Sequence, residues 1–275
     1  MDVQRLAAFA DGDLGGNPAG VVIRDSLPDV ETMQDVAREV GYSETVFAAP
    51  VGNRWSVRYF APVGEVPFCG HATVALGAAL GQAHGAGAFH LDTFAAGPVE
   101  VRAEAEGDHW QAELTSPPAH HDAPLAGTVA RAMLLFGLTG ADLDPTLRPI
   151  CAHAGADHLI ISLHDRSRLA TMTYDLSEGA ALMREVGLVT ISLIHVAQDG
   201  IVHARNAFAS GGVIEDPATG AAAAALAGWW RDADLRHGRI EIAQGHDMGV
   251  PSRLFATALP GQGAGVRVAG RVRVI

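Results

Sequence analysis

The sequence of 275 residues is poor in aromatic residues and cysteines, and it has no long apolar run. Aromatic side chains make up 6% of it, which argues against platforms for stacking bases or sugars. Two cysteines, Cys69 and Cys151, are too few for a secreted disulfide framework or a structural zinc site, so reduced thiols are expected. The longest apolar run, Ala221 to Trp230, is about half as long as a membrane span.

Basic residues are also few. Lys and Arg number 19 against 31 acidic residues, giving a formal net charge of -12. This charge repels phosphate backbones and anionic lipid, and no Lys/Arg run provides a local exception. The first residues lack the charged start and apolar core of a signal peptide. We therefore expect a cytoplasmic protein that binds neither nucleic acid nor membrane.

Strand-like and helix-like segments alternate through two halves that resemble each other in outline. Each half contains one helix that is apolar on all sides, predicted at 70–81 and at 219–230, and such a helix is normally buried. A Pro-rich break at 116–121 is the best linker candidate. We predict an N-terminal domain at 1–116, completed by the last strand at about 265–275, and a C-terminal domain at 117–264. The other predicted helices are 29–40, 129–136 and 176–186, and the predicted strands are 3–9, 19–24, 45–49, 55–60, 99–104, 109–114, 158–163, 191–198, 202–208, 239–244, 253–258 and 264–274.

The starts of the two apolar helices are candidate anion sites. A helix N-terminus exposes unpaired N–H groups and carries partial positive charge, and glycine lets a ligand approach the backbone. Gly70 and Gly220 stand at these starts. Two such termini facing each other across a domain cleft would hold a carboxylate and acidify a neighbouring C–H bond. The alternative is that both are buried Ala/Gly helices without a chemical role.

Three side chains near these helices are candidates for acid–base chemistry. Glu44 lies between a predicted helix and an apolar strand, where a buried carboxyl group would be suited to proton exchange near neutrality. It could equally be a solvated turn residue or the partner of an Arg. Asp216 precedes a proline and could be a turn former. His71 could merely satisfy backbone groups, or it could bind substrate and relay a proton.

Other chemistries receive less support from the residues. Cys69 could be a thiolate base at a helix start. A symmetric two-thiol racemase is disfavoured, because the corresponding position before the second helix holds Asp216. The run His120-His121-Asp122 lacks a spaced third metal ligand, so no metal site is predicted. Nucleotide-binding glycine motifs, a GKS/GKT phosphate loop and a GxSxG elbow are all missing.

Six blocks spread over the chain resemble the PhzF-like family, named for the isomerase of phenazine biosynthesis, within the diaminopimelate-epimerase-like fold. The block around Cys69-Gly70-His71-Ala72-Thr73 is the most specific. The others are Gly16-Asn17-Pro18-Ala19, Tyr42-Ser43-Glu44-Thr45, Arg58-Tyr59-Phe60-Ala61-Pro62, Glu215-Asp216-Pro217-Ala218-Thr219-Gly220 and Gln244-Gly245.

The resemblance implies an α+β fold of two pseudo-symmetric domains, each a curled, mostly antiparallel sheet around a central small-residue helix. It implies a biosynthetic homodimer that uses no cofactor and no metal. Glu44 looks like the proton shuttle, and His71 and Asp216 look like its substrate-contacting partners. The residues that look like the rest of the substrate site are Asn17, Gly70, Ala72, Thr73, Gly220, Ala221 and Ala222.

Two positions depart from the family pattern. Ala221 replaces a frequent Ser, and the run Gly249-Val250-Pro251 stands where Gly-Arg-Pro is frequent. Both changes argue against the phenazine precursor as substrate. We expect an isomerase that moves a proton on a small carboxylate bound between the domains, with Glu44 as base and acid. The alternatives are a racemase or epimerase that uses Cys69 with a carboxylate partner, and a carboxylate-binding protein that has lost its chemistry.

Overall fold

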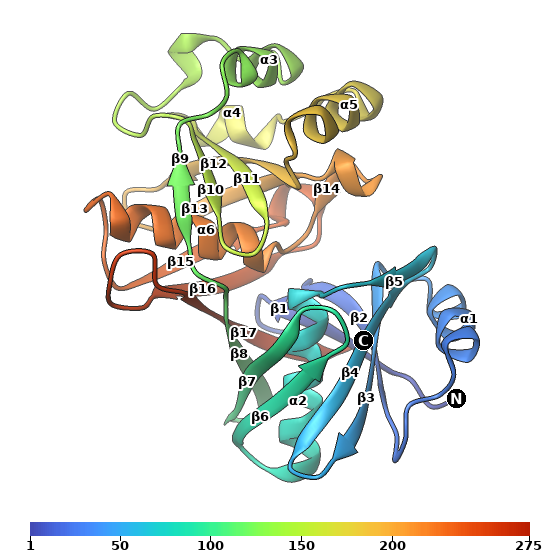
Figure 1. The fold of residues 1–275 in the computed structure, drawn as a ribbon. Coiled ribbons are helices and arrows are strands. Elements are labelled where there is room, and N and C mark those ends of the chain that lie inside the picture. Colours follow the sequence, from blue (N-terminus) through green and yellow to red (C-terminus); the bar gives the residue numbers. More distant parts are fainter. The chain divides into compact units, whose positions relative to one another are not determined.

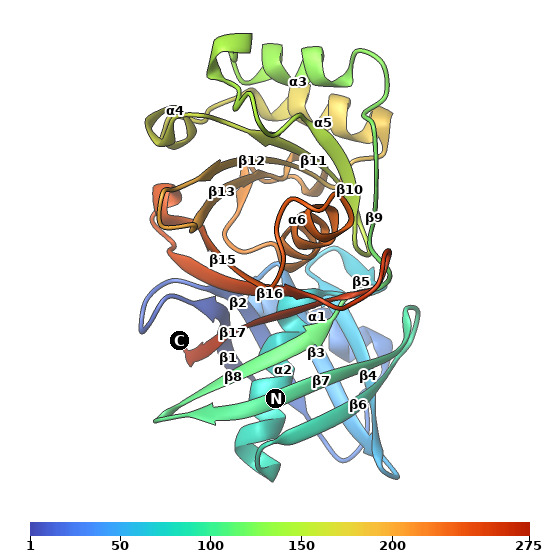
Figure 2. The ribbon, with the colours of Figure 1, turned by 90° about the vertical axis from the view of Figure 1, so that its left-hand side faces the viewer.

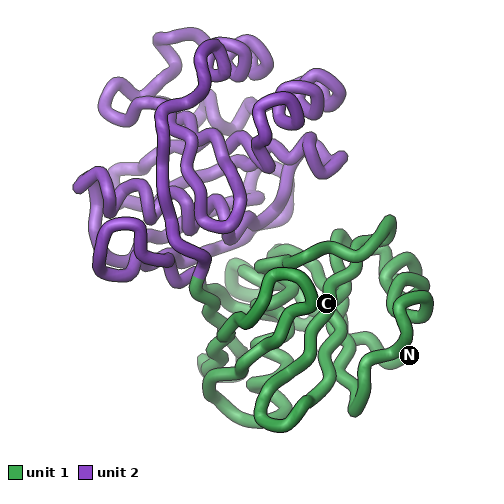
Figure 3. The backbone as a smooth tube through the Cα atoms, in the orientation of Figure 1, with its two compact units in different colours: residues 1–115, 269–275 green, residues 116–268 purple.

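The structure, a computed structural model, describes residues 1–275 and divides into two compact units. Unit 1 comprises Met1–Thr115 and Ala269–Ile275, and unit 2 comprises Ser116–Val268 (Figure 3). The chain therefore passes between the units twice, and the second passage occurs within one strand, β17 (Val266–Val274). None of the helices combines the length and the hydropathy that a membrane crossing requires.

Unit 1 is a strongly curled mixed sheet around one helix, α2 (Gly70–His84) (Figures 1 and 2). β1 pairs antiparallel with β2 and with the end of β17, and β2 runs parallel to β3. β4 pairs antiparallel with β3 and parallel with β6, and β6, β7 and β8 follow as an antiparallel set. The strands are β1 (Gln4–Ala10), β2 (Asn17–Ile23), β3 (Glu44–Val51), β4 (Arg54–Ala61), β5 (Gly64–Val66), β6 (Gly87–Thr93), β7 (Gly97–Glu106) and β8 (His109–Thr115).

Small residues let the strands of unit 1 approach α2 closely. Residues 72–81 of this helix are all buried. A Cβ atom on Gly77 would lie 2.5 Å from Val101 of β7, and one on Gly81 would lie 2.6 Å from the Trp110 ring of β8. Because such distances are well below van der Waals contact, only glycine fits at these two positions without displacing a strand.

The second helix of unit 1, α1 (Val30–Val40), lies outside the sheet and is amphipathic. Asp29 caps its start by accepting a hydrogen bond of 2.7 Å from the backbone N–H of Thr32, and Gly41 ends it in the left-handed conformation. Its buried residues Met33 and Ala37 pack in a small core with Phe47 and Phe60. This helix end delivers the chain to Glu44, the first residue of β3.

Unit 2 is a layered arrangement in which a sheet separates the central helix α6 (Gly220–Asp232) from three outer helices (Figure 2). The outer layer encloses a core that includes Leu159, Ile161 and Met183. The outer helices are α3 (Thr128–Leu135), α4 (Arg166–Ala170) and α5 (Leu176–Val186). The strands of unit 2 are β9 (His120–Asp122), β10 (Ile150–His153), β11 (Asp157–Ser162), β12 (Thr190–Val196), β13 (Val202–Ala207), β14 (Glu215–Asp216), β15 (Arg239–Gln244) and β16 (Ser252–Ala258). Unit 2 also has the short 3-10 helices η1 (Gly140–Asp142), η2 (Ala209–Gly211) and η3 (His246–Met248).

Most of the predicted elements are present, and the differences concern short segments. The prediction that 116–121 is a linker is wrong for its end, because His120 belongs to β9 and pairs with His153 of β10. The predictions also omit β5, β6, β10, β14, α4 and the three 3-10 helices.

Candidate active site

In unit 1 the structure brings Glu44 and His71 together. Glu44 begins β3 and His71 lies in the first turn of α2. The distance between Glu44 Oε2 and His71 Nε2 is 3.4 Å, and the side chains are 21% and 10% exposed. The Ser43 hydroxyl also lies 3.4 Å from the same ring nitrogen. A carboxylate and an imidazole are thus in near contact, where both reach solvent and neither is deeply buried.

Cys69 also contacts this imidazole ring. Its Sγ is 3.3 Å from His71 Nδ1 and 3.8 Å from Nε2, and the residue is 8% exposed. Cys69 is the N-cap of α2, no side chain caps the first turn, and that turn contains no acidic residue. The partial positive charge of the helix start is therefore available to a negatively charged ligand. Ligand atoms of Glu44, Cys69 and His71 lie within 4.8 Å of one another, so this trio could also hold a divalent ion.

Two further predicted residues of unit 1, Ala72 and Thr73, lie in the first turn of α2. Ala72 and Thr73 are fully buried. The Thr73 hydroxyl donates to the carbonyl of Cys69 at 2.7 Å and lies 2.7 Å from the Tyr59 hydroxyl. Burial raises the pKa of Tyr59 well above its ordinary value, so its phenol stays neutral. This contact fixes the start of α2 behind Gly70.

Asn17 begins β2, the strand beside Glu44. It is 3% exposed, and Ala19, two residues later, is the register partner of Glu44. Side chains two residues apart in a strand point to the same face. Asn17 and Ala19 therefore share one face of the sheet, next to the strand that begins with Glu44.

In unit 2 the loop before α6 holds Asp216 by hydrogen bonds. The Thr219 hydroxyl donates to Asp216 Oδ2 at 2.6 Å. Gly220, Ala221 and Ala222 then form the first turn of α6, and no acidic residue or side-chain cap occupies it. The start of α6 thus resembles that of α2, because neither first turn contains an acidic residue or a side-chain cap.

Gln244 and Asn206 support this loop, and the residue patterns did not identify them as site residues. Gln244 donates to the Asp216 carbonyl at 2.7 Å and accepts from the Thr219 N–H at 3.2 Å. Asn206 donates to Gln244 at 3.0 Å, and both are buried. Buried amides of this kind need partners. The Gln-Gly block was the only sequence signal for Gln244, and the local sequence provided none for Asn206.

The backbone conformation at Gly245 explains why a glycine follows Gln244 in the Gln-Gly block. Its φ is 77°, and a Cβ there would lie 2.2 Å from the Val250 carbonyl and 2.9 Å from that of Pro217. Only glycine permits this approach. The backbone at Val250 therefore packs against the same loop that carries Asp216.

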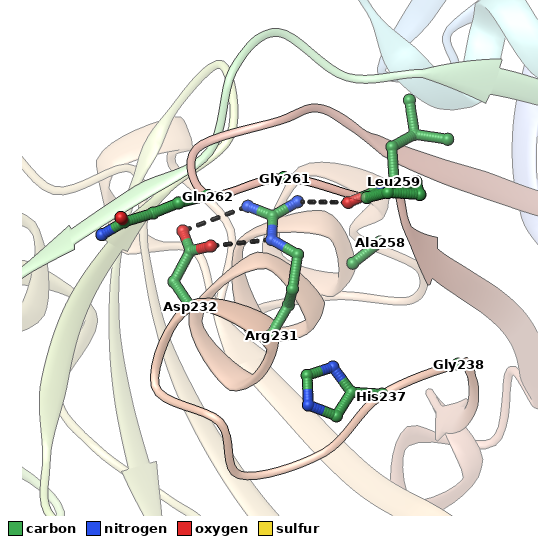
Figure 4. A pocket seen from close by; sticks show the side chains of 9 residues that line it. Arg231, Asp232, His237, Gly238, Ala258, Leu259, Gly261 and Gln262 are labelled. Atoms are coloured by element: carbon green, nitrogen blue, oxygen red, sulfur yellow. Dashed lines mark hydrogen bonds and ion pairs between the residues drawn. The ribbon is translucent and has the colours of Figure 1, made fainter.

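A pocket of about 480 Å³ in unit 2 is lined by other residues (Figure 4). Arg231 at the end of α6 pairs with Asp232 and donates to the carbonyls of Leu259 and Ala264, at 3.1 and 2.7 Å. Asp232 also accepts from the N–H of Gly263. These polar groups are occupied in fastening the loop after β16 to α6, which indicates a structural role.

The sequence profile of the family described as phenazine biosynthesis-like protein matches residues 6–274. The chain belongs to this family. An isomerase of Deinococcus radiodurans described as uncharacterized is 33% identical over 258 residues, which cover 90% of this chain and 84% of that protein. The family assignment made from the six sequence blocks is thereby confirmed.

Solved structures agree with the family assignment. A phenazine biosynthesis protein of the PhzF family from Bacillus anthracis matches with a TM-score of 0.86 and 23% identity, covering 100% of this chain and 98% of that one. A predicted epimerase from Pseudomonas aeruginosa matches with a TM-score of 0.82 and 27% identity, covering 99% and 96%. The predicted α+β fold class and the predicted enzyme class, isomerase, are confirmed.

Proposed function

We propose that this family member is a cofactor-independent isomerase that moves a proton between two carbons of a small carboxylate, with Glu44 as base and then acid. The observation that carries the proposal is the 3.4 Å contact of Glu44 with His71 at the uncapped start of α2. It combines a proton acceptor with a region of positive partial charge. Abstraction of a proton beside a carboxylate requires both.

In the proposed reaction, Glu44 takes a proton from a carbon next to a carbon–carbon double bond of the substrate. The electron pair left on that carbon forms the shifted double bond, and negative charge spreads toward the far carbon of the original double bond and the substrate carboxylate. The N–H groups at the start of α2 stabilise the added negative charge. Glu44, now protonated, returns the proton to a second carbon, so no atom or electron is gained or lost. His71 orients Glu44 and a polar group of the substrate. General base catalysis of this kind supplies about 10²- to 10⁴-fold, and positioning supplies the remainder.

We extend the proposal to Asp216 and to the first turn of α6. The Thr219 hydrogen bond and the Gln244 amide hold the Asp216 loop in a defined conformation, as a substrate-binding loop requires. Asp216 would orient an amino or hydroxyl group of the substrate. Engagement of one substrate by residues of both units stays a prediction, as does assembly into a homodimer.

A second candidate function is an epimerase in which Cys69 is the base. The 3.3 Å contact between Cys69 Sγ and His71 Nδ1 favours it, because an imidazole that accepts the thiol proton generates a reactive thiolate. Glu44, which contacts Nε2 of the same ring, would orient His71. The two candidates share one cluster and differ in which atom removes the substrate proton.

Deuterium incorporation separates these candidates. A panel of small cyclic and amino-acid carboxylates is first screened by thermal shift. Each compound that binds is then incubated in D₂O with the wild type, Glu44→Gln and Cys69→Ala. We expect Glu44→Gln to lower exchange by about 10²-fold or more. We expect Cys69→Ala to retain most of it. Glu39→Gln, on the exposed side of α1, is the matched control and should behave as the wild type.

The opposite pattern, exchange lost in Cys69→Ala and kept in Glu44→Gln, would establish the epimerase candidate. Exchange that survives in both variants would contradict both candidates. Compounds that bind tightly without exchange in the wild type would instead indicate a carboxylate-binding protein.

A further inference from the structure

Three side chains with metal-binding chemistry lie side by side on neighbouring strands of unit 2. His153 of β10 is the register partner of His120 on β9 and of Asp157 on β11 (Figure 1). Register partners on adjacent strands point to the same face of a sheet. The three side chains therefore form one row across β9, β10 and β11, in which His120 joins the His153–Asp157 hairpin pair from a segment 33 residues earlier.

The distances within this row suit a shared ion. The imidazole rings of His120 and His153 are stacked with centroids 4.5 Å apart, and His153 Nδ1 lies 2.9 Å from Asp157 Oδ1. Ligand atoms of all three residues lie within 4.8 Å of one another. Ligands at about 2.0–2.1 Å from a tetrahedral ion are about 3.3 Å apart, so the separations of the ligand atoms need to shorten by at most about 1.5 Å to complete the site. His153 and Asp157 are 28% and 58% exposed, which permits that shift and lets an ion enter.

A second carboxylate lies on the same face beside the row. Asp122 is two residues after His120 in β9, so both point to one side of the sheet. Its register partner is Cys151, two residues before His153. Two carboxylates beside two imidazoles give this face a negative field that attracts cations.

We propose that His120, His153 and Asp157 bind a divalent transition-metal ion of the Zn²⁺ class, with water in the remaining positions. Two imidazoles and one carboxylate favour Zn²⁺, Cu²⁺, Ni²⁺ or Co²⁺ over Mg²⁺ and Ca²⁺, which prefer oxygen ligands. The ion would fasten β9, the first strand of unit 2, to the β10–β11 hairpin. The sequence expectation of no metal rested on the contiguous run 120–122 and on the family resemblance, whereas the fold adds His153 and Asp157 to His120.

Titration calorimetry with ZnCl₂ on the tag-free full-length chain tests this proposal. The background variant is His71→Gln, which disables the Glu44–Cys69–His71 trio as a competing site. On that background we expect one Zn²⁺ per chain. The double change His120→Ala and His153→Ala should abolish it, and Asp157→Asn should weaken binding by about 10- to 100-fold.

His237→Ala is the matched control. His237 forms a similar exposed His–Asp pair, 2.7 Å from Asp234, with no second imidazole stacked on it. Its removal should leave the affinity unchanged. On the same His71→Gln background, Zn²⁺ should also raise the melting temperature with and without His237→Ala, and leave that of the folded double variant unchanged. Equal Zn²⁺ affinity in the double variant, or loss of all binding in His71→Gln alone, would overturn the proposal.

Discussion

At the scale of single residues, His71 determines how the candidate active site can work. Its Nε2 lies 3.4 Å from Glu44, and the Sγ of Cys69 lies 3.3 Å from Nδ1 and 3.8 Å from Nε2. One imidazole thus links a carboxylate to a thiol at the start of a helix. Either Glu44 or Cys69 can become the base, depending on which of the two groups has lost its proton. This arrangement explains why the two candidate functions share a site.

The same trio provides a prediction about metal removal. Direct proton transfer by Glu44 needs no ion, so exchange activity should be unchanged after dialysis against EDTA. The measurement is deuterium incorporation before and after chelation, and again after addition of Zn²⁺. Added Zn²⁺ should inhibit, because an ion held by Glu44, Cys69 and His71 would occupy the base. Activity that disappears with EDTA and returns with Zn²⁺ would contradict the proposed mechanism.

Glu215, the neighbour of Asp216, gives a prediction about stability. Glu215 and Arg205 form an ion pair with side chains 3% and 9% exposed, and Arg205 also donates to the Ala170 carbonyl. Glu215→Gln leaves the buried guanidinium without its countercharge, which should lower the free energy of unfolding by about 3 kcal/mol. Urea denaturation measures the change.

An exposed ion pair of the same type serves as the control for Glu215. Arg131 and Glu185 are also bidentate, but they are 47% and 63% exposed. Because exposed pairs are well solvated, Glu185→Gln should cost less than about 1 kcal/mol. Equal losses in the two variants would show that burial does not govern the strength of the Arg205–Glu215 pair.

At the scale of elements, the two central helices use glycine in the same way. In unit 1 a Cβ on Gly77 would lie 2.5 Å from Val101, and in unit 2 a Cβ on Gly228 would lie 2.5 Å from Ala119. α2 is thereby brought close to β7, and α6 to the segment just before β9.

Gly77→Ala tests the close packing of α2. Alanine favours a helix by about 1 kcal/mol over glycine, but overpacking a core costs about 1–3 kcal/mol. We expect a net loss of about 1 kcal/mol in the free energy of unfolding. Adding Val101→Ala removes the clashing methyl groups, so the double variant should be more stable than the sum of the two single changes predicts. Gly87→Ala, with no neighbour within 4 Å of the added Cβ, is the control.

Element prediction from sequence succeeded where a segment was long and strongly patterned. The helices at 70–81 and 219–230 and the amphipathic helix at 29–40 were identified, because ten or more residues show one consistent pattern. β10 and α4 span 4 and 5 residues, too few for a periodic signal. β9 was interpreted as a linker because its local sequence follows two prolines, and its strand character comes from pairing with β10.

Local sequence patterns do not predict which residues of the candidate sites lie close together in the fold. Glu44 and His71 are brought together by the packing of β3 beside α2, and only the family resemblance indicated their relation before the structure. His120, His153 and Asp157 meet through the register of three strands. Register depends on the whole sheet, so a scan for closely spaced ligands does not detect such a row.

At the scale of the whole molecule, the net charge of -12 opposes an anionic substrate at long range. Attraction must therefore arise locally, from the N-termini of α2 and α6, whose first turns contain no acidic residue. Salt screens the repulsion between distant charges more than the short-range helix contacts. For an anionic substrate we expect KM to fall as ionic strength rises from 0.01 to 0.15 M, about the range over which the Debye length shortens from 30 to 8 Å.

Both ends of the chain build unit 1, so its C-terminus should be essential for the candidate active site. β17 pairs with β1 from Leu6 opposite Val274 to Ala10 opposite Arg271. Arg273 also donates to the Gly15 carbonyl at 2.9 Å. Removal of 269–275 exposes the hydrogen-bonding edge of β1 and the apolar side chains that β17 covers. We expect this truncation to unfold unit 1 and to abolish exchange activity.

Hydrogen exchange followed by mass spectrometry measures the effect on each unit separately. In the truncated chain, amides of β1 to β3 and α2 should lose protection, whereas those of β11 to β13 and α5 should keep it, because their contacts lie within unit 2. Deletion of Ile275 alone is the control. It removes one backbone hydrogen bond, to the Arg5 carbonyl, and should cost about 1 kcal/mol. Full protection of α2 after removal of 269–275 would mean that unit 1 folds without its last strand, and the C-terminus would then have no part in positioning Glu44 and His71.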